Sequence, residues 1–595
     1  PISVGPRNGV KMDGGRVKHV EFHPTDANTY YVSTFKGGLF RTTDAGTNWT
    51  PLTDQLVEDV YISQVDPTDA NTIYIGTNLG VLKSTDGGSS WGATGLTTSN
   101  TNALLIKPDA PSVVVVGNDS GIYLSLDGGA NFSMVQSAVR VEELRVHPTN
   151  PDIMYAGTDG SPSQFFRSVD GGQTWTENTT DFGQGTFMKI AVSPASPNVV
   201  YVINSRDHMG EDSYEGVYRS TDSGATFTRR SGGVPCITGY SDTGAISRGQ
   251  PNYNLFIVSD PTDSDIIYAG GVKSWRSTDG GQTWVQFFNN VTADGGALHL
   301  DQLTWAYSPH TNVLFAANDG GIYHLNGNGQ FQQITDGLPI AEVFACAQSQ
   351  TNPEVVAGGT MHCGIKLNRG GDWFSPWGGD EATVIFDYTN DTYAYHFKNQ
   401  RIHRSSDGGM SFQRINPLTA DSGEYRGTGV LDKSDVNTLF VGLLEVERIN
   451  NARTATSSTV WDKISSFGGG DKIKKIEQSD ADHNIMYVSR GNGSFYRSDN
   501  VRGANPIWTN LTGSLPSSGN VADIATHPTN ANIVYLLQGS KIYKSSNKGG
   551  SWSDISTGLP GVALLEMVYD RTSNEGIYVG TDLGVYYKDA NLNSW

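Results

Sequence analysis

The sequence has little cysteine, a shortage of basic residues and no long hydrophobic run, and each shortage excludes a class of protein. Three cysteines in 595 residues are too few for a disulfide framework, and Cys236, Cys346 and Cys363 lack the paired spacing of a zinc site. With 61 acidic and 41 basic side chains the net charge is −20, which would repel a phosphate backbone, so no nucleic-acid partner is expected. No segment approaches the roughly 20 apolar residues that cross a bilayer, so no membrane span is expected.

Charged residues are also scarce, at 17%, whereas aromatic residues make up 10% of the chain. That composition is too rich in large rings for a disordered protein. Glycine accounts for 71 residues, well above the roughly 7% of average usage, and predicts many tight turns and few long helices. The chain opens at Pro1 without a basic region and a following apolar stretch, so we expect that any export signal has been removed or was never present.

An eight-residue pattern recurs along the chain, with Ser or Thr first, Asp third, Gly fifth and an aromatic residue last. Clear copies begin at Thr42, Ser84, Ser125, Ser168, Ser220, Ser277 and Ser405. Their third residues are Asp44, Asp86, Asp127, Asp170, Asp222, Asp279 and Asp407. Six degenerate copies bring the total to thirteen, spaced about 38 to 57 residues apart, which is the range of four-stranded propeller blades.

The residue types of the octet predict a structural turn. Ser or Thr ends a strand, the Asp carboxylate accepts hydrogen bonds from amides of its own turn, Gly supplies positive φ, and the aromatic residue enters the core. Upstream of most copies a strand is followed by a Pro turn and a second strand, as in His23-Pro24-Thr25-Asp26 before Tyr30. Together the two patterns make one blade, and we expect ligands to bind away from the octet carboxylates.

With these motifs the chain resembles Asp-box (BNR) repeat propellers, as in xyloglucanase-type glycoside hydrolases of family 74 and in sortilin-type proteins. The resemblance covers essentially the whole sequence and implies an all-β fold, but such boxes occur in enzymes and receptors alike. A more specific resemblance is to secreted bacterial BNR-repeat, glycosyl-hydrolase-like proteins, carried by His299–Gln302, Asn318–Tyr323 and Gly378–Asp380. It implies an extracellular or cell-surface location.

Thirteen blades exceed the four to eight that typically close one propeller. We therefore expect two tandem propellers, residues 1–335 and 336–595, with seven blades each. Seven octets precede this cut and six follow it, so the second ring needs a further blade, which the N-terminal strands could complete. The xyloglucanase resemblance implies a cleft between two rings packed face to face, and a seven-plus-six arrangement stays open.

The resemblance assigns no catalytic residue. A glycosidase needs two carboxylates, roughly 5 to 10 Å apart, that flank the scissile bond. In xyloglucanase-like enzymes one catalytic Asp lies in a T-D-x-G-G segment before the first box, and the matching stretch here, Thr34–Gly38, has Phe35 at that position. A phenyl ring cannot exchange a proton. No cofactor is expected, although acidic turns could hold structural Ca²⁺ through oxygen ligands.

Polar and aromatic residues near the junction of the halves form the candidate ligand site. These candidates are His299, Asp301, Asp319, Asp380, Glu381, Trp305 and Trp377. We predict that His299 and Asp301 alternate on a strand and face the same way. The carboxylates either bind a ligand or metal at the propeller face or pin neighbouring blades through buried hydrogen bonds. The indoles either stack on sugar rings or pack in the core.

Three functions remain open at this point. The first is a secreted or cell-surface propeller that binds glycan or another surface ligand in the cleft between its rings. The second is a glycoside hydrolase that acts on a plant or algal polysaccharide, and the third is sortilin-like capture of a peptide or protein. The expected partner is thus a polysaccharide or a cell-surface or protein ligand. Two inward-pointing carboxylates in an open cleft lined by Trp would favour the hydrolase.

Overall fold

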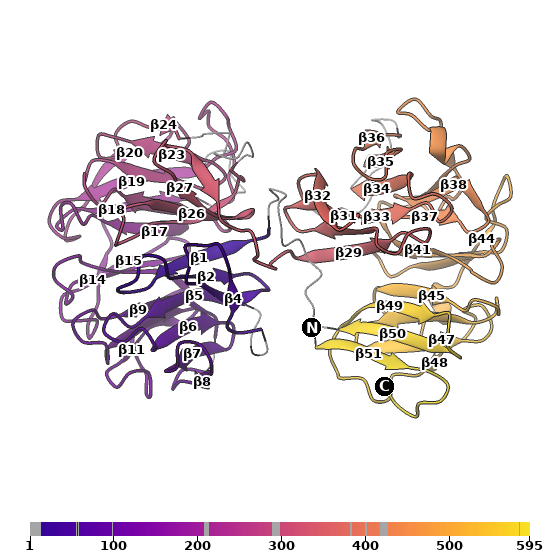
Figure 1. The fold of residues 1–595 in the computed structure, drawn as a ribbon, viewed down its shortest axis with the longest axis horizontal. Helices are drawn as coiled ribbons and strands as arrows, with labels where there is room; N and C mark the ends of the chain where they lie inside the picture. Colours follow the sequence, from indigo (N-terminus) through magenta and orange to yellow (C-terminus); the bar gives the residue numbers. More distant parts are fainter. Residues whose placement is uncertain are drawn as a thin grey trace. The chain divides into compact units, whose positions relative to one another are not determined.

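A computed structural model describes residues 14–54, 56, 59–97, 99–206, 213–287, 298–380, 383–398, 401–416, 427–581 and 583–595. These residues fold almost entirely into antiparallel β-sheets (Figure 1). Within them the helices are two 3-10 turns, η1 (Ala452–Thr454) and η2 (Thr512–Ser514), and no helix has the length and apolarity to span a membrane. The predicted all-β class with four-stranded antiparallel blades is confirmed.

The chain divides into two compact units, Pro1–Glu342 and Val343–Trp595, a few residues beyond the predicted cut near residue 335. The described residues of the first unit form seven four-stranded sheets. Their strands are β1 (Val17–Phe22), β2 (Tyr30–Thr34), β3 (Gly38–Thr42) and β4 (Thr50–Pro51); β5 (Val60–Val65), β6 (Ile73–Thr77), β7 (Gly80–Ser84) and β8 (Gly92–Ala93); β9 (Thr101–Ile106), β10 (Val114–Asn118), β11 (Gly121–Ser125) and β12 (Ser133–Ser137); β13 (Val141–Val146), β14 (Met154–Thr158), β15 (Phe165–Ser168) and β16 (Thr176–Asn178); β17 (Phe187–Val192), β18 (Val200–Ser205), β19 (Tyr214–Ser220) and β20 (Thr228–Ser231); β21 (Phe256–Ser259), β22 (Ile267–Gly270), β23 (Ser274–Ser277) and β24 (Val285–Gln286); and β25 (Gln302–Tyr307), β26 (Leu314–Asn318), β27 (Gly321–Leu325) and β28 (Phe331–Gln333).

The second unit contains six sheets among its described residues, and the last of them has three strands. Their strands are β29 (Val343–Gln348), β30 (Val356–Thr360), β31 (Gly364–Arg369) and β32 (Asp372–Trp377); β33 (Thr383–Phe386), β34 (Ala394–Lys398), β35 (Arg401–Ser405) and β36 (Gln413–Arg414); β37 (Thr428–Asp432), β38 (Asp435–Gly442), β39 (Val446–Ile449) and β40 (Asp462–Lys463); β41 (Ile473–Gln478), β42 (Met486–Arg490), β43 (Phe495–Ser498) and β44 (Trp508–Asn510); β45 (Asp523–Thr526), β46 (Val534–Gln538), β47 (Lys541–Ser545) and β48 (Ser553–Asp554); and β49 (Leu564–Asp570), β50 (Gly576–Thr581) and β51 (Gly584–Lys588).

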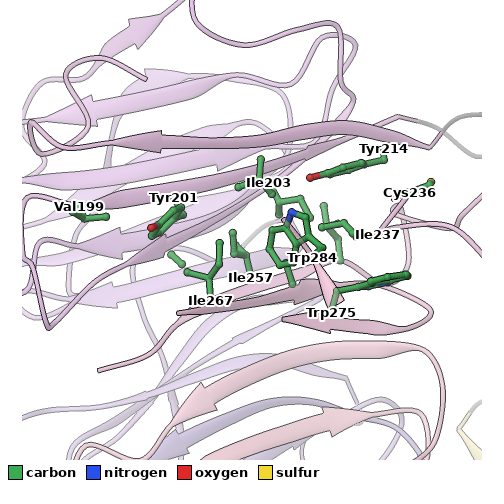
Figure 2. Packing of buried hydrophobic residues seen from close by; sticks show 14 residues of the cluster. Val199, Tyr201, Ile203, Tyr214, Cys236, Ile237, Ile257, Ile267, Trp275 and Trp284 are labelled. Atoms are coloured by element: carbon green, nitrogen blue, oxygen red, sulfur yellow. The ribbon is translucent and has the colours of Figure 1, made fainter. Parts of the chain in front are cut away.

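The sheets of the first unit form a closed ring. The first strand of each sheet contacts the first strand of the next, and β1 also contacts β25, which joins the seventh sheet to the first. Apolar side chains fill the space between neighbouring sheets, as between β17–β20 and β21–β24, where Tyr201 and Ile203 pack with Ile257, Ile267 and Trp284 (Figure 2). The completion of the second ring by residues 1–12 concerns a segment outside the described residues.

Each clear octet forms the hydrogen bonds that its residue types predict. In the second sheet Ser84 Oγ donates to Asp86 Oδ1 at 2.8 Å, the Gly88 amide donates to Ser84 Oγ at 2.8 Å, and the Ser90 amide donates to Asp86 Oδ1 at 2.8 Å. Both Gly87 and Gly88 have positive φ. The same bonds recur at Asp44, Asp127, Asp170, Asp222, Asp279 and Asp407.

The tryptophan that ends an octet ties its sheet to the preceding one. The indole N–H of Trp91 donates to the carbonyl of Leu52 at 3.0 Å, and that of Trp508 donates to the carbonyl of Ile464 at 2.8 Å. The indole of Trp175 instead bonds within its own turn. These aromatic residues are half-buried against the neighbouring sheet rather than deep in their own core.

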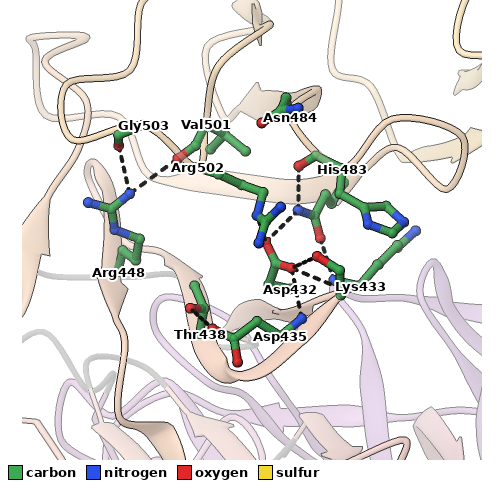
Figure 3. A network of polar contacts seen from close by, with 12 residues as sticks. Asp432, Lys433, Asp435, Thr438, Arg448, His483, Asn484, Val501, Arg502 and Gly503 are labelled. Carbon is green, nitrogen blue, oxygen red and sulfur yellow. Dashed lines mark hydrogen bonds and ion pairs between the residues drawn. The ribbon is translucent and has the colours of Figure 1, made fainter.

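Buried acidic turns add a second kind of tie between sheets. Asp432, which is fully buried, accepts the amide of Ser434 at 2.9 Å and the side-chain amide of Gln478 at 3.0 Å (Figure 3). The guanidinium of Arg502 pairs with the same carboxylate at 3.0 Å. One side chain at the end of β37 is thus bonded to β41 and to the loop after β43.

Candidate functional site

A cavity of about 310 Å³ lies where the innermost strands of the first unit converge. Its walls come from β1, β5, β9, β13, β17 and β25, together with the segment that leads into β21. All seven sheets of the ring therefore meet around it. The cavity is called the ring pocket below.

Most of these strands reach the ring pocket through a β-bulge, an extra residue in one strand of an antiparallel pair. On β13, Val141 pairs with Thr158 and Glu143 pairs with Gly157, which leaves Glu142 between them. Lys18 on β1 is displaced in the same way. The other bulge residues in the pocket wall are Tyr61 on β5, Asn102 on β9 and Leu303 on β25.

Five charged side chains line the ring pocket, three basic and two acidic. They are Lys18, Arg140, Lys189, Glu142 and Asp159. Arg140 Nε lies 2.7 Å from one oxygen of Glu142, and Lys189 Nζ lies 3.8 Å from the other. The Lys18 ammonium lies over the ring of Tyr61, 4.4 Å from its centroid. Asp159 directly follows β14, and its amide donates to the carbonyl of Arg140 at 2.9 Å.

The two carboxyl groups of the ring pocket differ in acidity. Burial, and next the negative charge of Glu142, raise the pKa of Asp159 to about 7. Burial acts on Glu142 in the same direction, but Lys189, Lys18 and Arg140 outweigh it and hold the pKa of Glu142 below its usual value. At pH 7 the Asp159 carboxyl therefore still holds its proton in about half of the molecules while Glu142 is ionised, which is the division of labour that acid–base catalysis requires.

Aromatic side chains form the apolar part of the wall. Phe35, in the turn between β2 and β3, lines the ring pocket together with Tyr61, Phe187 and Tyr253. The guanidinium of Arg16 stacks on Phe35 at 4.2 Å from the ring centroid and is held by Glu342 at 2.6 Å. Such rings beside a few polar groups are typical of small-molecule sites.

Two predicted site residues lie behind this wall. The Tyr253 hydroxyl donates to Asp319 Oδ1 at 2.5 Å, and Asn254 Nδ2 donates to Asp301 Oδ1 at 2.6 Å. Gln250 also donates to Asp301. These bonds join the segment before β21 to the sheet of β25–β28. Of the two roles that the sequence allows for Asp301 and Asp319, they therefore have the one in which buried hydrogen bonds hold neighbouring blades together.

Two expectations near β25 need correction. His299 and Asp301 do not alternate on a strand, because they precede β25 and Asp301 has a φ of 63°. The ring nitrogen Nδ1 of His299 instead lies 2.7 Å from the carbonyl of Leu300. Trp305 is only 3% exposed and stacks on Phe256 at 4.7 Å between ring centroids, so its faces are covered by protein and cannot hold a sugar.

The remaining predicted residues belong to the second unit. Asp380 lies 3.0 Å from the ring nitrogen Nδ1 of His362, and Trp377 is half-buried, with its ring 4.7 Å from that of His403. Glu381 lies outside the described residues. The predicted assembly of these residues with those of the first unit into one site stays a prediction.

Among the described residues no three His, Cys, Asp or Glu side chains are arranged to hold a metal ion, and the three cysteines form no disulfide bond. The structural Ca²⁺ that acidic turns could hold stays a prediction.

Sequence reasoning missed Lys18, Glu142, Asp159 and Lys189. For Lys18, Glu142 and Lys189 a signal was present in the first strand of each blade, where charged residues stand among apolar ones, as in Met188-Lys189-Ile190. A regular strand would place successive side chains on opposite faces, and the bulge that turns Glu142 toward the ring axis cannot be read from that alternation.

Comparison with known proteins agrees with the Asp-box resemblance. The Sortilin-Vps10 family model (Sortilin, neurotensin receptor 3) matches residues 120–238. A xyloglucanase from Paenibacillus sp. is 28% identical over 220 residues, 32% of this chain and 19% of that protein. A xyloglucanase from Hypocrea jecorina (strain QM6a) is 22% identical over 317 residues, 52% of this chain and 26% of that protein. The matches thus span about a fifth to a quarter of the curated relatives.

A solved structure extends the likeness to the whole fold. The crystal structure of an ancestral GH74 enzyme matches with a TM-score of 0.66 at 15% identity and covers 100% of this chain and 95% of that one. At this identity the likeness establishes the fold. The chain is therefore a BNR-type, GH74-like propeller protein.

Proposed function

We propose that this protein is a glycoside hydrolase that acts on a polysaccharide and that the ring pocket of its first unit is the sugar site. The pairing of Glu142 with Asp159 carries the proposal, because one pocket holds a proton donor and an ionised carboxylate near neutral pH. The similarity to two xyloglucanases supports the reaction class. A polysaccharide substrate of this kind favours an extracellular location.

Asp159 would protonate the glycosidic oxygen as the bond breaks, since its raised pKa keeps a proton available. Glu142, kept ionised by Arg140 and Lys189, would act on the opposite side of the sugar, either on water or on the anomeric carbon. Tyr61 and Phe187 line the pocket and would contact the apolar parts of the sugar.

Phe35 separates this arrangement from the one that the xyloglucanase resemblance implies. It occupies the position of the first-blade Asp and lines the same pocket. The carboxyl groups that we assign instead come from the fourth sheet, on β13 and just after β14. Phe35 also favours a second candidate function, glycan binding without cleavage.

The two functions are separated by incubating the protein with plant and algal polysaccharides and measuring new reducing ends. We expect cleavage by the parent protein and a fall of about 100-fold or more for Glu142→Gln and for Asp159→Asn, the usual size of an acid–base contribution. Glu177→Gln, an exposed carboxylate on β16, is the matched control and should cleave normally.

Cleavage by both pocket variants at the parent rate would refute the assignment of Glu142 and Asp159. Binding of a polysaccharide without any new reducing ends would instead establish the glycan-binding function.

A further inference from the structure

One cation of the ring pocket has no carboxylate within ion-pair distance among the described residues. Arg140 pairs with Glu142, and Lys189 lies 3.8 Å from Glu142 and 3.6 Å from Glu143. Lys18 forms no ion pair with a described carboxylate and instead faces two aromatic rings, Tyr61 at 4.4 Å and Phe35 at 5.7 Å. Its place at a β-bulge directs it to the pocket wall.

The charge of the pocket opposes that of the chain. The protein carries a net charge of −20, yet the pocket wall has three basic and two acidic side chains. When Asp159 holds its proton, the basic excess grows. Burying an ammonium without a counter-ion costs free energy, and a neutral sugar that displaced water from Lys18 would increase this cost.

We propose that the ring pocket selects an acidic sugar, whose carboxylate or sulfate group pairs with the ammonium of Lys18 between Phe35 and Tyr61. The inference rests on the proposed sugar site and adds the class of sugar that it takes. An anion at Lys18 would supply the counter-charge that no described carboxylate provides within ion-pair distance of this ammonium.

The test compares the binding of three oligosaccharides of equal length by titration calorimetry: one with glucuronic acid, one with sulfate esters and one neutral xyloglucan fragment. The background is Asp159→Asn, because an amide imitates the protonated carboxyl and prevents turnover without adding charge. We expect at least one acidic probe to bind about tenfold or more tightly than the neutral one, with an affinity that falls as salt is added. The acidic probe that binds shows whether the pocket prefers a carboxylate or a sulfate group.

Lys18→Met keeps an unbranched side chain and removes the charge, so the preference for the acidic probe should disappear. Lys18→Arg should retain it. Lys36→Met is the matched control, because Lys36 belongs to the same sheet but pairs with Asp59 outside the pocket wall. Thermal unfolding of each variant confirms that it folds.

Equal affinity for acidic and neutral probes, or a preference that survives Lys18→Met, would overturn the inference and leave the sugar site standing. The protein could bind an acidic probe through Lys18 and yet cleave no polysaccharide. That result would support the inference and would refute only the proposal that the protein is a hydrolase. If none of the three probes binds, both proposals fail.

Discussion

Glu142 owes its place in the ring pocket to one extra residue in β13. The bulge lets Val141 and Leu144 stay in the apolar core while the carboxylate turns toward the ring axis. Lys18 on β1 follows the same rule. In a regular strand the alternation of side chains would not allow both an apolar core and a charged pocket wall at these positions. The extra residue of each bulge allows both.

The raised pKa of Asp159 predicts how activity responds to pH. Because the protonated carboxyl is the proposed acid, the cleavage rate should fall about tenfold per pH unit once the pH rises above about 7. A pH–rate profile between pH 5 and 9 measures this limb. A rate that stays constant from pH 6 to 9 would contradict the role of Asp159.

The raised pKa of Asp159 also affects stability. It makes the folded protein less stable as the pH rises, whereas a carboxylate held in a salt bridge makes it more stable. An unfolded Asp titrates near about 4, so between about pH 4 and 7 the folded protein binds more protons and stability declines as the pH rises. Asp159→Asn should therefore unfold at a higher temperature than the parent at pH 8 and at about the same temperature at pH 4. This comparison does not depend on activity.

The candidate residues show what a sequence reveals at this scale. Asp301 and Asp319 stand beside recognisable motifs and do reach the surroundings of the pocket, but they lie one layer behind it. Lys18 and Asp159 belong to no motif. Their importance comes from register and from the closure of the ring, which bring residues more than a hundred positions apart into one wall.

At the scale of elements, the octet could be understood almost completely from its residues. The order of Ser, Asp, Gly and an aromatic residue predicts the turn, and the hydrogen bonds at Asp86 follow that order. The direction of the indole could not be predicted, because its acceptor is the carbonyl of a different sheet, about 40 residues away for Trp91 and Leu52.

The indole hydrogen bonds predict a difference between two octets of the second unit. Trp508→Phe removes the bond to the carbonyl of Ile464 and leaves that carbonyl without its donor, so the free energy of unfolding should fall by about 1 kcal/mol. The indole N–H of Trp552 is buried and has no hydrogen-bond partner among the described residues. Trp552→Phe should therefore cost less than Trp508→Phe.

Urea unfolding of the two variants, followed by circular dichroism, measures this difference. Equal losses would mean that ring packing alone, and not the bond between sheets, decides the contribution of these tryptophans.

At the scale of the molecule, the two units differ in how their first and last sheets are covered by neighbouring sheets. In the first unit β1 packs against β25, so each sheet has a neighbouring sheet on both sides. In the second unit the sheet β49–β51 leaves Leu565, Val568, Tyr578 and Val585 between 45% and 73% exposed. The count of seven octets before the division and six after it predicts this contrast from the sequence, whereas the burial of each face had to come from coordinates.

The exposed face predicts that substitutions on the last sheet behave as surface substitutions although its sequence is that of a core strand. Val585 on β51 is 73% exposed, so Val585→Ser should change the free energy of unfolding by no more than about 0.5 kcal/mol. Val488 on β42 is fully buried between two sheets, and Val488→Ser should cost about 2 kcal/mol or more, because it opens a cavity and buries a hydroxyl. Hydrogen exchange should likewise be faster in β49–β51 than in β41–β44. If the two serine variants lose equal stability, the face of β49–β51 is covered in solution, and the second unit has a seventh layer beyond its six described sheets.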